Sequence, residues 1–395
     1  MAFNMNPTTT QVKYPFNGHL NPNEVFATIY NTIINQIVKY PDLVDNYNFV
    51  EKFRTEGSMY GDTVLIYDQD VLHTRPWLGD LEAQNLLAIE RPDDPSCQAI
   101  TLDKFRICKT SLDSYLSKRA WMAENAFTQF NDIVMAMVAN TKKLYEVCMM
   151  NTYVGTVEGG TTKSDYEVPL SDITETGEAK NRLEAQMIAQ YVADLIVDLK
   201  DYSRDYNDYG YMRAYNEADL MVIWNSKYVN KINKLDLPTI FNKAGLMDKF
   251  EQNILPARYF GEQINTDSLP SGITISEESV DGVNVTVAVI GSGFTGTVRT
   301  MEEGDFTSGH KFPGEALAVG DKILLTKDNT IPAYVEDEDI ICKVITKDTI
   351  KYMAAFETGT DFWNPQALVT SKMLIWGFST PTRVLGQPCV TVHAD

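Results

Sequence analysis

The longest uninterrupted amphipathic pattern in the chain runs from Ala123 to Thr152. Its apolar side chains recur at alternating spacings of three and four residues, which places them on one face of a helix. The predicted packing face consists of Phe127, Phe130, Val134, Met137, Thr141, Leu144 and Cys148. No Gly or Pro interrupts the stretch, and a helix of this extent is ~45 Å long. Such a rod needs a long groove or a partner chain, so we predict that it is a structural spine.

Shorter periodic stretches predict the other regular elements. Helices are expected from Asn21 or Asn23 to Pro41, over Asn181–Tyr202, and from Asn225 through Leu235. Strands are expected at Asp62–Val71, Gln98–Lys109 and the wholly apolar Leu220–Trp224. The segment between the first two strands holds Pro76, Gly79, Pro92 and Pro95. So much turn chemistry between two strands predicts a projecting hairpin.

The pattern changes to short β-rich runs over residues 268–346, where Gly, Pro and acidic turns separate the runs. This texture predicts a small β subdomain or insertion. The residues that follow favour further strands, with Trp363 and Trp376 as expected core anchors. The predicted fold class is α+β.

Composition narrows the class of protein. The chain has 395 residues, of which 44% are hydrophobic and 22% charged, as in ordinary globular proteins. Its net charge of −20 argues against a dedicated nucleic-acid binder, because phosphate neutralisation needs clustered Lys and Arg. The five cysteines show no metal-ligand spacing and indicate reduced thiols in a cytosolic compartment. The first residues lack a signal-peptide pattern, and no apolar stretch is long enough to predict a membrane span.

One glycine-rich run matches a nucleotide-binding fingerprint. Gly291, Gly293 and Gly296 have the GxGxxG spacing after a strand-like run. That chemistry needs a helix N-terminus directly behind the glycines to hold a pyrophosphate. Gly304 and Pro313 follow too closely for a helix to start there. We therefore interpret the run as a turn between strands.

Candidate metal ligands are incomplete. Asp205 and Asn207 match part of a calcium loop, but Tyr209 stands where an oxygen ligand is required and Asn216 where a bidentate Glu is required. The acidic run at residues 336–339 is more typical of a solvated turn. We predict no metal-binding residue and no bound cofactor.

Catalytic signals are also missing from the sequence. The four histidines are His19, His73, His310 and His393. None of them lies in a motif with a nucleophile, and neither a GxSxG elbow nor a catalytic-cysteine signature is present. We predict no catalytic residue, and we expect that the chain is not an enzyme.

The order of the elements resembles that of a known family. ICKTSLDSYLSKRAW before the spine and NTYVGT at its end resemble the entry to and exit from the spine helix of the major capsid proteins of tailed double-stranded DNA phages, which have the Hong Kong 97-type fold. ADLMVIWNSKYVNKINKLDLP resembles the strand and helix of their axial domain, and MLIWGFSTPTRVLGQPCVTV resembles their closing strands. GEALAVGDKILLTKD and IKYMAAFETG are similar to capsid proteins of small short-tailed phages.

The resemblance implies a domain plan. It consists of an N-terminal arm (1–22), an N-terminal helix region (23–56), an extended β-hairpin loop (57–105), a peripheral domain with the spine helix (106–177), an axial domain (178–345) with a β-rich insertion at about 268–345, and C-terminal strands that return to the peripheral domain (346–395). The extended loop would reach over a neighbouring subunit.

The resemblance also implies a function and partners. The chain would be a structural subunit of an icosahedral phage head that self-assembles into pentamers and hexamers around the double-stranded DNA genome, without sequence-specific contacts to the DNA. The subunit would assemble in the bacterial host cytoplasm and reside in the virion, with no membrane contact. Its short arm implies a separate scaffolding protein, and a portal is expected. No lysine lies between Arg54 and Asp103, which predicts a shell without the covalent cross-link that some members form.

Three alternatives remain open on the sequence. The first is an encapsulin-like nanocompartment shell that stores a cargo enzyme. The second is a cytosolic α/β enzyme with a β-rich insertion. The third is a β-rich adhesion or tail-fibre module, which the long spine and the further helices disfavour.

Overall fold

The structure of the chain is a computed structural model. It describes residues 49–56, 63–76, 89, 91–112, 124–233, 251–280, 283–326, 328–366 and 369–395. The chain divides into two compact units. One comprises Met1–Val44, Cys108–Asn140 and Gly359–Leu374, and the other comprises Asp45–Ile107, Thr141–Thr358 and Ile375–Asp395. The predicted arm and the helix that should end at Pro41 lie outside the described residues.

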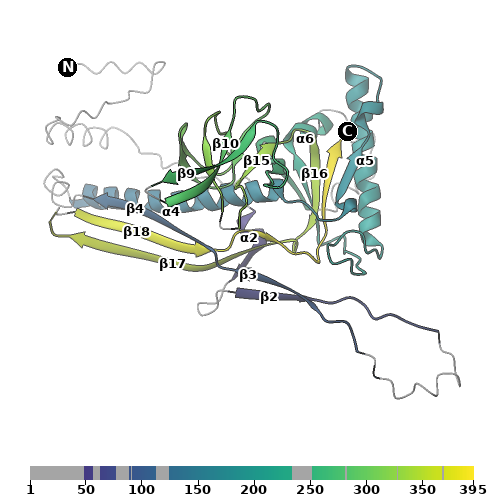
Figure 1. Ribbon diagram of the computed structural model, residues 1–395, viewed down its shortest axis with the longest axis horizontal. Helices are drawn as coiled ribbons and strands as arrows, with labels where there is room; N and C mark the ends of the chain where they lie inside the picture. The colour runs from purple at the N-terminus through teal and green to yellow at the C-terminus, as the bar shows by residue number, and fades with distance from the viewer. Residues whose placement is uncertain are drawn as a thin grey trace. The chain divides into compact units, whose positions relative to one another are not determined.

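The predicted spine is helix α4 (Glu124–Thr156), drawn as a long horizontal helix in Figure 1. The helix runs without a break for 33 residues, as expected for a stretch without Gly or Pro over most of its length. It continues four residues beyond the predicted end. The first part of the connector after Thr152 is therefore helical.

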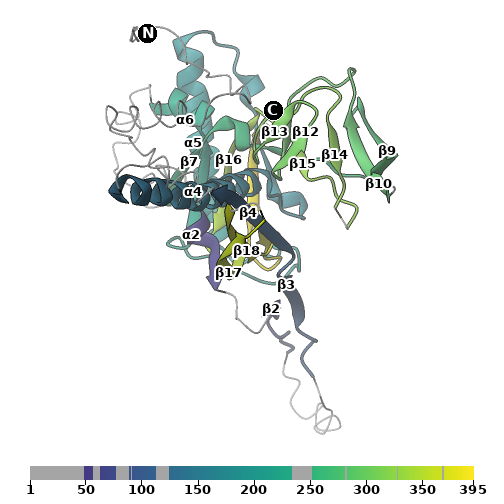
Figure 2. The ribbon, with the colours of Figure 1, turned by 90° about the vertical axis from the view of Figure 1, so that its left-hand side faces the viewer.

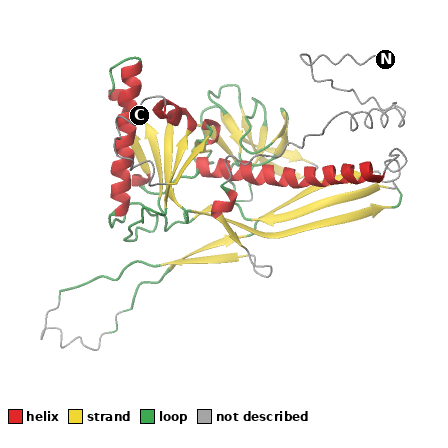
Figure 3. Cartoon of the chain, turned by 180° about the vertical axis from the view of Figure 1, so that it is seen from behind, coloured by secondary structure: helices red, strands yellow, loops and turns green. Residues whose placement is uncertain are grey.

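A five-stranded sheet forms the core of the larger unit. Its order is β5 (Asp165–Val168), β20 (Cys389–Ala394), β16 (Ile340–Thr346), β6 (Leu220–Asn225) and β7 (Glu251–Leu255). Helices α5 (Glu178–Lys200) and α6 (Ser226–Asn233) contribute to the same apolar cluster as β6, β16 and β20 (Figure 3). Every residue of β6 is buried, which confirms the predicted buried strand. We did not expect β20, from the segment assigned to C-terminal strands, to lie between β5 and β16.

A second sheet contains the longest strands. Its order is β1 (Arg54–Glu56), β17 (Ile350–Asn364), β18 (Val369–Phe378) and β4 (Lys104–Leu112), and the short β19 (Thr382–Arg383) also pairs with β17. Helix α2 (Val50–Phe53) leads directly into β1. Trp376 is buried, as predicted, whereas Trp363 near the end of β17 is about half exposed.

Most of the β-rich runs of residues 268–346 are short strands, several of which Figure 2 labels. They are β9 (Ile273–Val280), β10 (Val283–Ile290), β11 (Val298–Thr300), β12 (Gly304–Phe306), β13 (Gly309–Lys311), β14 (Lys322–Leu324) and β15 (Ala333–Glu336), and β15 pairs with β8 (Gly261–Gln263), which precedes the range. The last run of the range, β16, belongs to the five-stranded sheet instead. The other strands form one sheet of β14, β10 and β9, another of β11, β15 and β8, and the hairpin β12–β13. One apolar cluster lies among these strands. The predicted strands are present, and their role as an insertion stays a prediction.

The predicted hairpin forms from β2 (Thr63–Asp68) and β3 (Ser96–Thr101), which pair antiparallel (Figure 1). The prediction of one strand over Gln98–Lys109 was wrong, because the chain leaves the hairpin after Thr101 and enters the second sheet as β4. The break occurs at Asp103, whose carboxylate accepts hydrogen bonds from the amide and hydroxyl of Thr380 at 2.7 and 2.5 Å. Short 3₁₀ turns complete the described structure at Thr162–Ser164, Leu170–Asp172 and Ala257–Tyr259.

Candidate assembly surfaces

The two faces of the β2–β3 hairpin differ in exposure. Side chains alternate along β2, so that Val64 and Ile66 are half-buried while Leu65 and Tyr67 are 50% and 65% exposed. Their cross-strand partners on the outer face are Ala99 and Cys97, which are also exposed. We call these four residues the outer hairpin face. A strand pair with large apolar side chains open to solvent on one face is typical of a surface that another chain covers.

The end of β2 is tied to the segment 203–213 by charged groups. Asp68 forms an ion pair with Arg213, and Asp70 forms one with Arg204 at 2.5 Å. The backbone amide of Met212 donates to Asp70 at 2.9 Å. That hydrogen bond, assisted by the Arg204 guanidinium, lowers the pKa of the Asp70 carboxyl to about 2. The carboxyl is therefore charged throughout the physiological pH range.

The other strand of the hairpin is fixed by neutral hydrogen bonds. The hydroxyls of Ser96 and Tyr211 are hydrogen-bonded at 2.6 Å. The Gln98 amide donates to the carbonyl of Arg383 at 2.7 Å and accepts from the amide of Leu385 at 3.1 Å. A Cβ at Gly386 would run into the Asp68 carboxylate, so a larger residue there would displace this side chain from its ion pair with Arg213.

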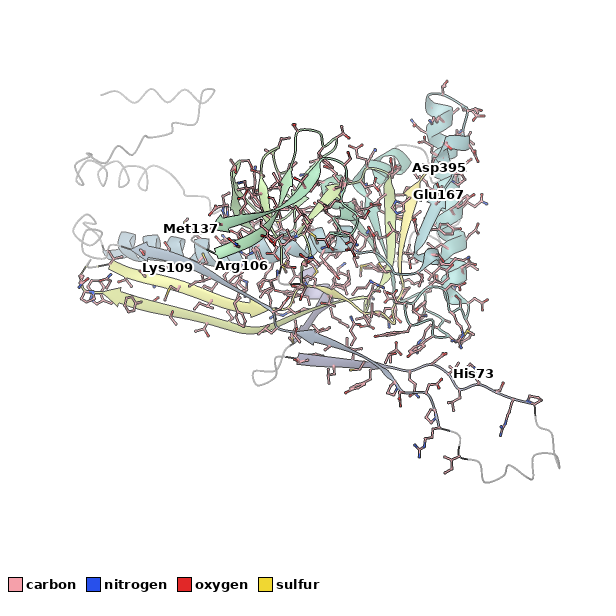
Figure 4. The ribbon with its side chains drawn as sticks, viewed as in Figure 1. His73, Arg106, Lys109, Met137, Glu167 and Asp395 are labelled. Carbon is pink, nitrogen blue, oxygen red and sulfur yellow. The ribbon has the colours of Figure 1, made fainter. Side chains whose placement is uncertain are left out.

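The spine helix buries a face that is offset from the predicted one. In the part of α4 with described side chains, Val138, Tyr145 and Met149 are buried. Of the predicted positions there, Met137 is 62% exposed, whereas Thr141, Leu144 and Cys148 are half-buried. The side chains of Phe127, Phe130 and Val134 lie outside the described ones. Met137 can be located on α4 in Figure 4. Packing of the predicted face against another chain stays a prediction.

Tyr145 explains where the buried face lies. Its ring packs against Trp376 and Phe378 of β18, with centroid distances of 6.3 and 5.7 Å. On β4, Arg106 stacks its guanidinium 4.9 Å from the centroid of the same ring, and burial raises the pKa of Tyr145 to about 12. The helical period alone could not indicate which flank the strand β18 would cover, because β18 follows more than two hundred residues later.

The C-terminal end of the spine contacts a buried lysine that sequence reasoning missed. Lys343, at the centre of β16, is fully buried, and its ammonium donates to the carbonyl of Val157, one residue beyond α4. The Cys389 thiol lies 3.8 Å from the same carbonyl oxygen. Burial lowers the pKa of Lys343, which nearby acidic groups partly oppose. This donor satisfies a carbonyl next to the end of a helix that has no basic residue of its own in its last turn.

The glycine-rich run forms a turn, as predicted. It joins β10 to β11, and strand β11 starts at Val298 where a nucleotide site would need a helix. The amide of Gly291 donates to the carbonyl of Gly272 at 2.8 Å. A Cβ at Gly272 would collide with the backbone of Phe294. These glycines therefore allow two backbones to approach closely.

The residues of the candidate calcium loop make structural hydrogen bonds. The buried Asn207 side chain donates to the carbonyl of Tyr211 at 2.7 Å and accepts from its amide at 2.8 Å, which shapes the loop. In the acidic run, Glu336 pairs with Arg299 and Glu338 pairs with Lys227. Within the described ranges, no group of three or more His, Cys, Asp or Glu residues is arranged to hold a metal ion.

The described histidines belong to different segments of the chain. His73 lies on the segment beyond β2 (Figure 4), His19 lies outside the described residues, and His393 pairs with Asp165 at 3.1 Å. The ring of His310 lies between Asp305 and Glu303 at 2.7 and 2.9 Å, and the hydrogen bond to Asp305 is the main reason that its pKa is raised. Across the described segments, no helix is both long and apolar enough to cross a membrane.

Solved structures with a similar fold are phage structures. One is a chain of the capsid structure of Staphylococcus phage Andhra, at a TM-score of 0.51 and 11% identity, covering 91% of this chain and 88% of that one. Another is a chain in the structure of the head fiber and inner core protein gp22 of native bacteriophage P68, at a TM-score of 0.51 and 12% identity, with the same coverages of 91% and 88%. At such identities the likeness concerns the fold, which is an α+β phage capsid fold.

The fold is thus the one found in phage capsid structures. The family model of the Phi29-like phage major capsid protein matches residues 8–375, and the chain belongs to that family. No curated protein sequence matches the chain. The resemblance inferred from the sequence is confirmed: the protein is a non-enzymatic structural subunit that assembles in many copies into the shell of a virion. Neither the nanocompartment nor the enzyme alternative is supported.

Proposed function

We propose that the subunit forms an icosahedral shell of pentamers and hexamers in the Hong Kong 97-type manner. In this plan residues 57–105 are the extended loop, residues 106–177 with the spine are the peripheral domain, residues 178–345 are the axial domain, and residues 346–395 supply the closing strands. The hairpin β2–β3, the long helix α4 and the β-rich insertion support this plan by their order.

The outer hairpin face carries the proposal. Leu65 and Tyr67 expose large apolar surfaces on a strand pair that has only one other face to bury. In a shell, each such face would lie on a neighbouring copy, and many small apolar contacts would add up over the particle. The predicted spine face around Met137 is a second surface that we assign to contacts with neighbouring copies.

The proposal extends to other partners. The genome would be double-stranded DNA, held without sequence-specific contacts because a chain with a net charge of −20 attracts phosphates weakly. A separate scaffolding protein and a portal would take part in assembly in the bacterial host cytoplasm. The shell would lack a covalent cross-link from the hairpin, since no lysine lies between Arg54 and Asp103.

A double variant of the outer hairpin face tests the assembly role. We expect Leu65→Asp with Tyr67→Asp to give folded subunits that no longer form particles, because charges would be buried against the neighbouring copy. The matched control is Val319→Asp, since Val319 is 63% exposed on the insertion. Sedimentation and negative-stain microscopy report particles, and circular dichroism reports folding. Normal particles from the double variant would contradict the proposal.

The cross-link has its own measurement. Denatured particles should show only the mass of the single chain, 44.5 kDa, by intact-mass analysis. A ladder of multiples of that mass would show that another residue forms a covalent link.

A further inference from the structure

The β2–β3 hairpin is held to its own chain mainly by polar contacts. A pair of strands is marginally stable on its own in water, so its direction must be set by what it touches. Of the apolar side chains of β2 and β3, Ile100 is the only one that is buried. Val64 and Ile66 are half-buried. The polar attachments are the ion pairs of Asp68 and Asp70, the hydrogen bonds of Ser96 and Gln98, and a hydrogen bond from Arg213 to the carbonyl of Gln69.

The receiving segment 203–213 is shaped without the hairpin. The backbones of Ser203 and Arg213 exchange two hydrogen bonds, at 2.9 and 3.0 Å, which close the segment into a loop. Inside it, the side chain of Asn207 is almost completely buried and forms hydrogen bonds with both the amide and the carbonyl of Tyr211. Asp208 forms an ion pair with Arg383 and also accepts a hydrogen bond from the amide of Gly160. These contacts fix the backbone of the loop and therefore the positions from which Arg204, Arg213 and Tyr211 reach the hairpin.

Charged groups surround the contact on each side. Asp70 faces the Arg204 guanidinium and the amides of Met212 and Val71. Asp68 faces Arg213 and lies near Tyr209. A cavity of about 490 Å³ adjoins the pair of Asp70 and Arg204, and its other titratable lining groups are His73, Arg91, Asp93, Asp94, Tyr209 and Tyr211. Ion pairs of this accessibility are screened by salt and are individually weak. Several of them together can hold the hairpin, yet they can open without disrupting an apolar core.

We propose that the loop 203–213 is a latch that fixes the direction of the β2–β3 hairpin within a single subunit, before any other copy is present. Arg204 and Arg213 form ion pairs at the end of β2, and Tyr211 forms a hydrogen bond at the start of β3. The hairpin is thereby presented in one orientation by its own chain. Opening the latch frees the hairpin while the five-stranded sheet stays folded.

Hydrogen exchange on unassembled subunits tests the latch. In the double variant Arg204→Gln with Arg213→Gln, we expect the amides of β2 and β3 to exchange about tenfold faster or more, while those of β6 and β16 are unchanged. Lys200→Gln is the matched control, because Lys200 lies in the same compact unit and forms its ion pair with Glu217 instead of with a residue of the hairpin. Asp70→Asn, which keeps the side-chain size, should accelerate the same hairpin amides.

The salt dependence of hydrogen exchange in the hairpin is a second, independent test of the latch. Raising the salt concentration from about 0.1 M to about 1 M shortens the Debye length from about 10 to about 3 Å, and it should accelerate exchange in the hairpin of the wild type but not in that of the double arginine variant. Unchanged hairpin exchange in the variants would overturn the proposal. An equal acceleration of amide exchange in β6 and β16 would also overturn it, since the loop would then stabilise the five-stranded sheet as well as the hairpin.

The consequence for assembly rests on the proposed function of the hairpin. If latch variants exchange rapidly as monomers and also form misshapen particles, both proposals hold. If they exchange rapidly yet build normal shells, the latch stands and the role of the hairpin between copies fails. The exchange measurement thus separates the failure of one proposal from the failure of the other.

Discussion

The five-stranded sheet and the β2–β3 hairpin are built from strands of similar length by opposite means. In the sheet, β6 and β16 bury every side chain, and even Lys343 is enclosed and hydrogen-bonded. In the hairpin, half of the side chains of β2 are exposed and the attachments are ionic and polar. The sheet therefore holds itself together through apolar burial, whereas the hairpin depends on its latch and on the copies that would cover it.

The largest expected effect is an aspartate at the centre of the sheet. Val344→Asp places an unpaired charge in a fully buried position of β16 and should cost about 4 kcal/mol or more of unfolding free energy. On the hairpin, Leu65→Asp should change the same quantity by no more than about 0.5 kcal/mol. Urea unfolding of unassembled subunits measures both variants. Equal losses would mean that the two regions are stabilised in the same way.

Two adjacent spine positions sharpen the comparison. Val138 is buried and Met137 is exposed, so Val138→Asp should destabilise the subunit by about 3 kcal/mol. Met137→Asp should leave the fold intact and reduce particle formation. Thermal unfolding and sedimentation distinguish these results. Strong destabilisation by Met137→Asp would show that this position already packs within the subunit.

The buried lysine gives a smaller effect. Lys343→Met removes the donor to the Val157 carbonyl and leaves the weaker thiol contact of Cys389. We expect a loss of about 1–2 kcal/mol in denaturant unfolding, because methionine fills the space but leaves that carbonyl poorly paired. Lys347→Met is the control, because Lys347 is exposed and directly follows β16. Unchanged or higher stability of Lys343→Met would mean that burying the ammonium costs as much as its hydrogen bond contributes.

The smallest effect is a pH dependence confined to the hairpin. Asp70 has a folded pKa of about 2, below its ordinary value of 3.8. A carboxyl with a depressed pKa contributes stability that is fully present above the ordinary value and is lost as the pH falls toward the folded value. Proteolytic cleavage of the hairpin by an acid-active protease should therefore increase between about pH 4 and pH 2. Asp70→Asn should lose this dependence, and an unchanged profile in that variant would assign it to another group.

Local patterns were sufficient to predict much of the fold. The uninterrupted helical period of α4, the wholly apolar β6 and the short strands after residue 268 each follow from residues close in the sequence. The family followed from the order of these elements. The boundary of the hairpin was wrong because the chain turns at Asp103 under the influence of Thr380, which lies far away along the chain.

The surfaces were harder to predict for the same reason. The buried side of the spine is set by Trp376 and Phe378, and the latch pairs Asp68 and Asp70 with arginines more than 130 residues later. The segment 203–213 was noticed only as an incomplete calcium loop, although its Arg and Tyr content was visible. Lys343 has no local signal at all, since a lysine in an apolar strand is more often at an exposed edge.

The position of β20 imposes an order on synthesis. Cys389–Ala394 separates β5 from β16, so the two parts of the sheet cannot join until these residues have left the ribosome. A chain cut short before them would present the bare edge of β16, with its unpaired backbone groups, and edges of that kind favour aggregation over orderly association. Residues 389–394 are thereby required for a sound building block, and a chain without them should associate poorly with other copies.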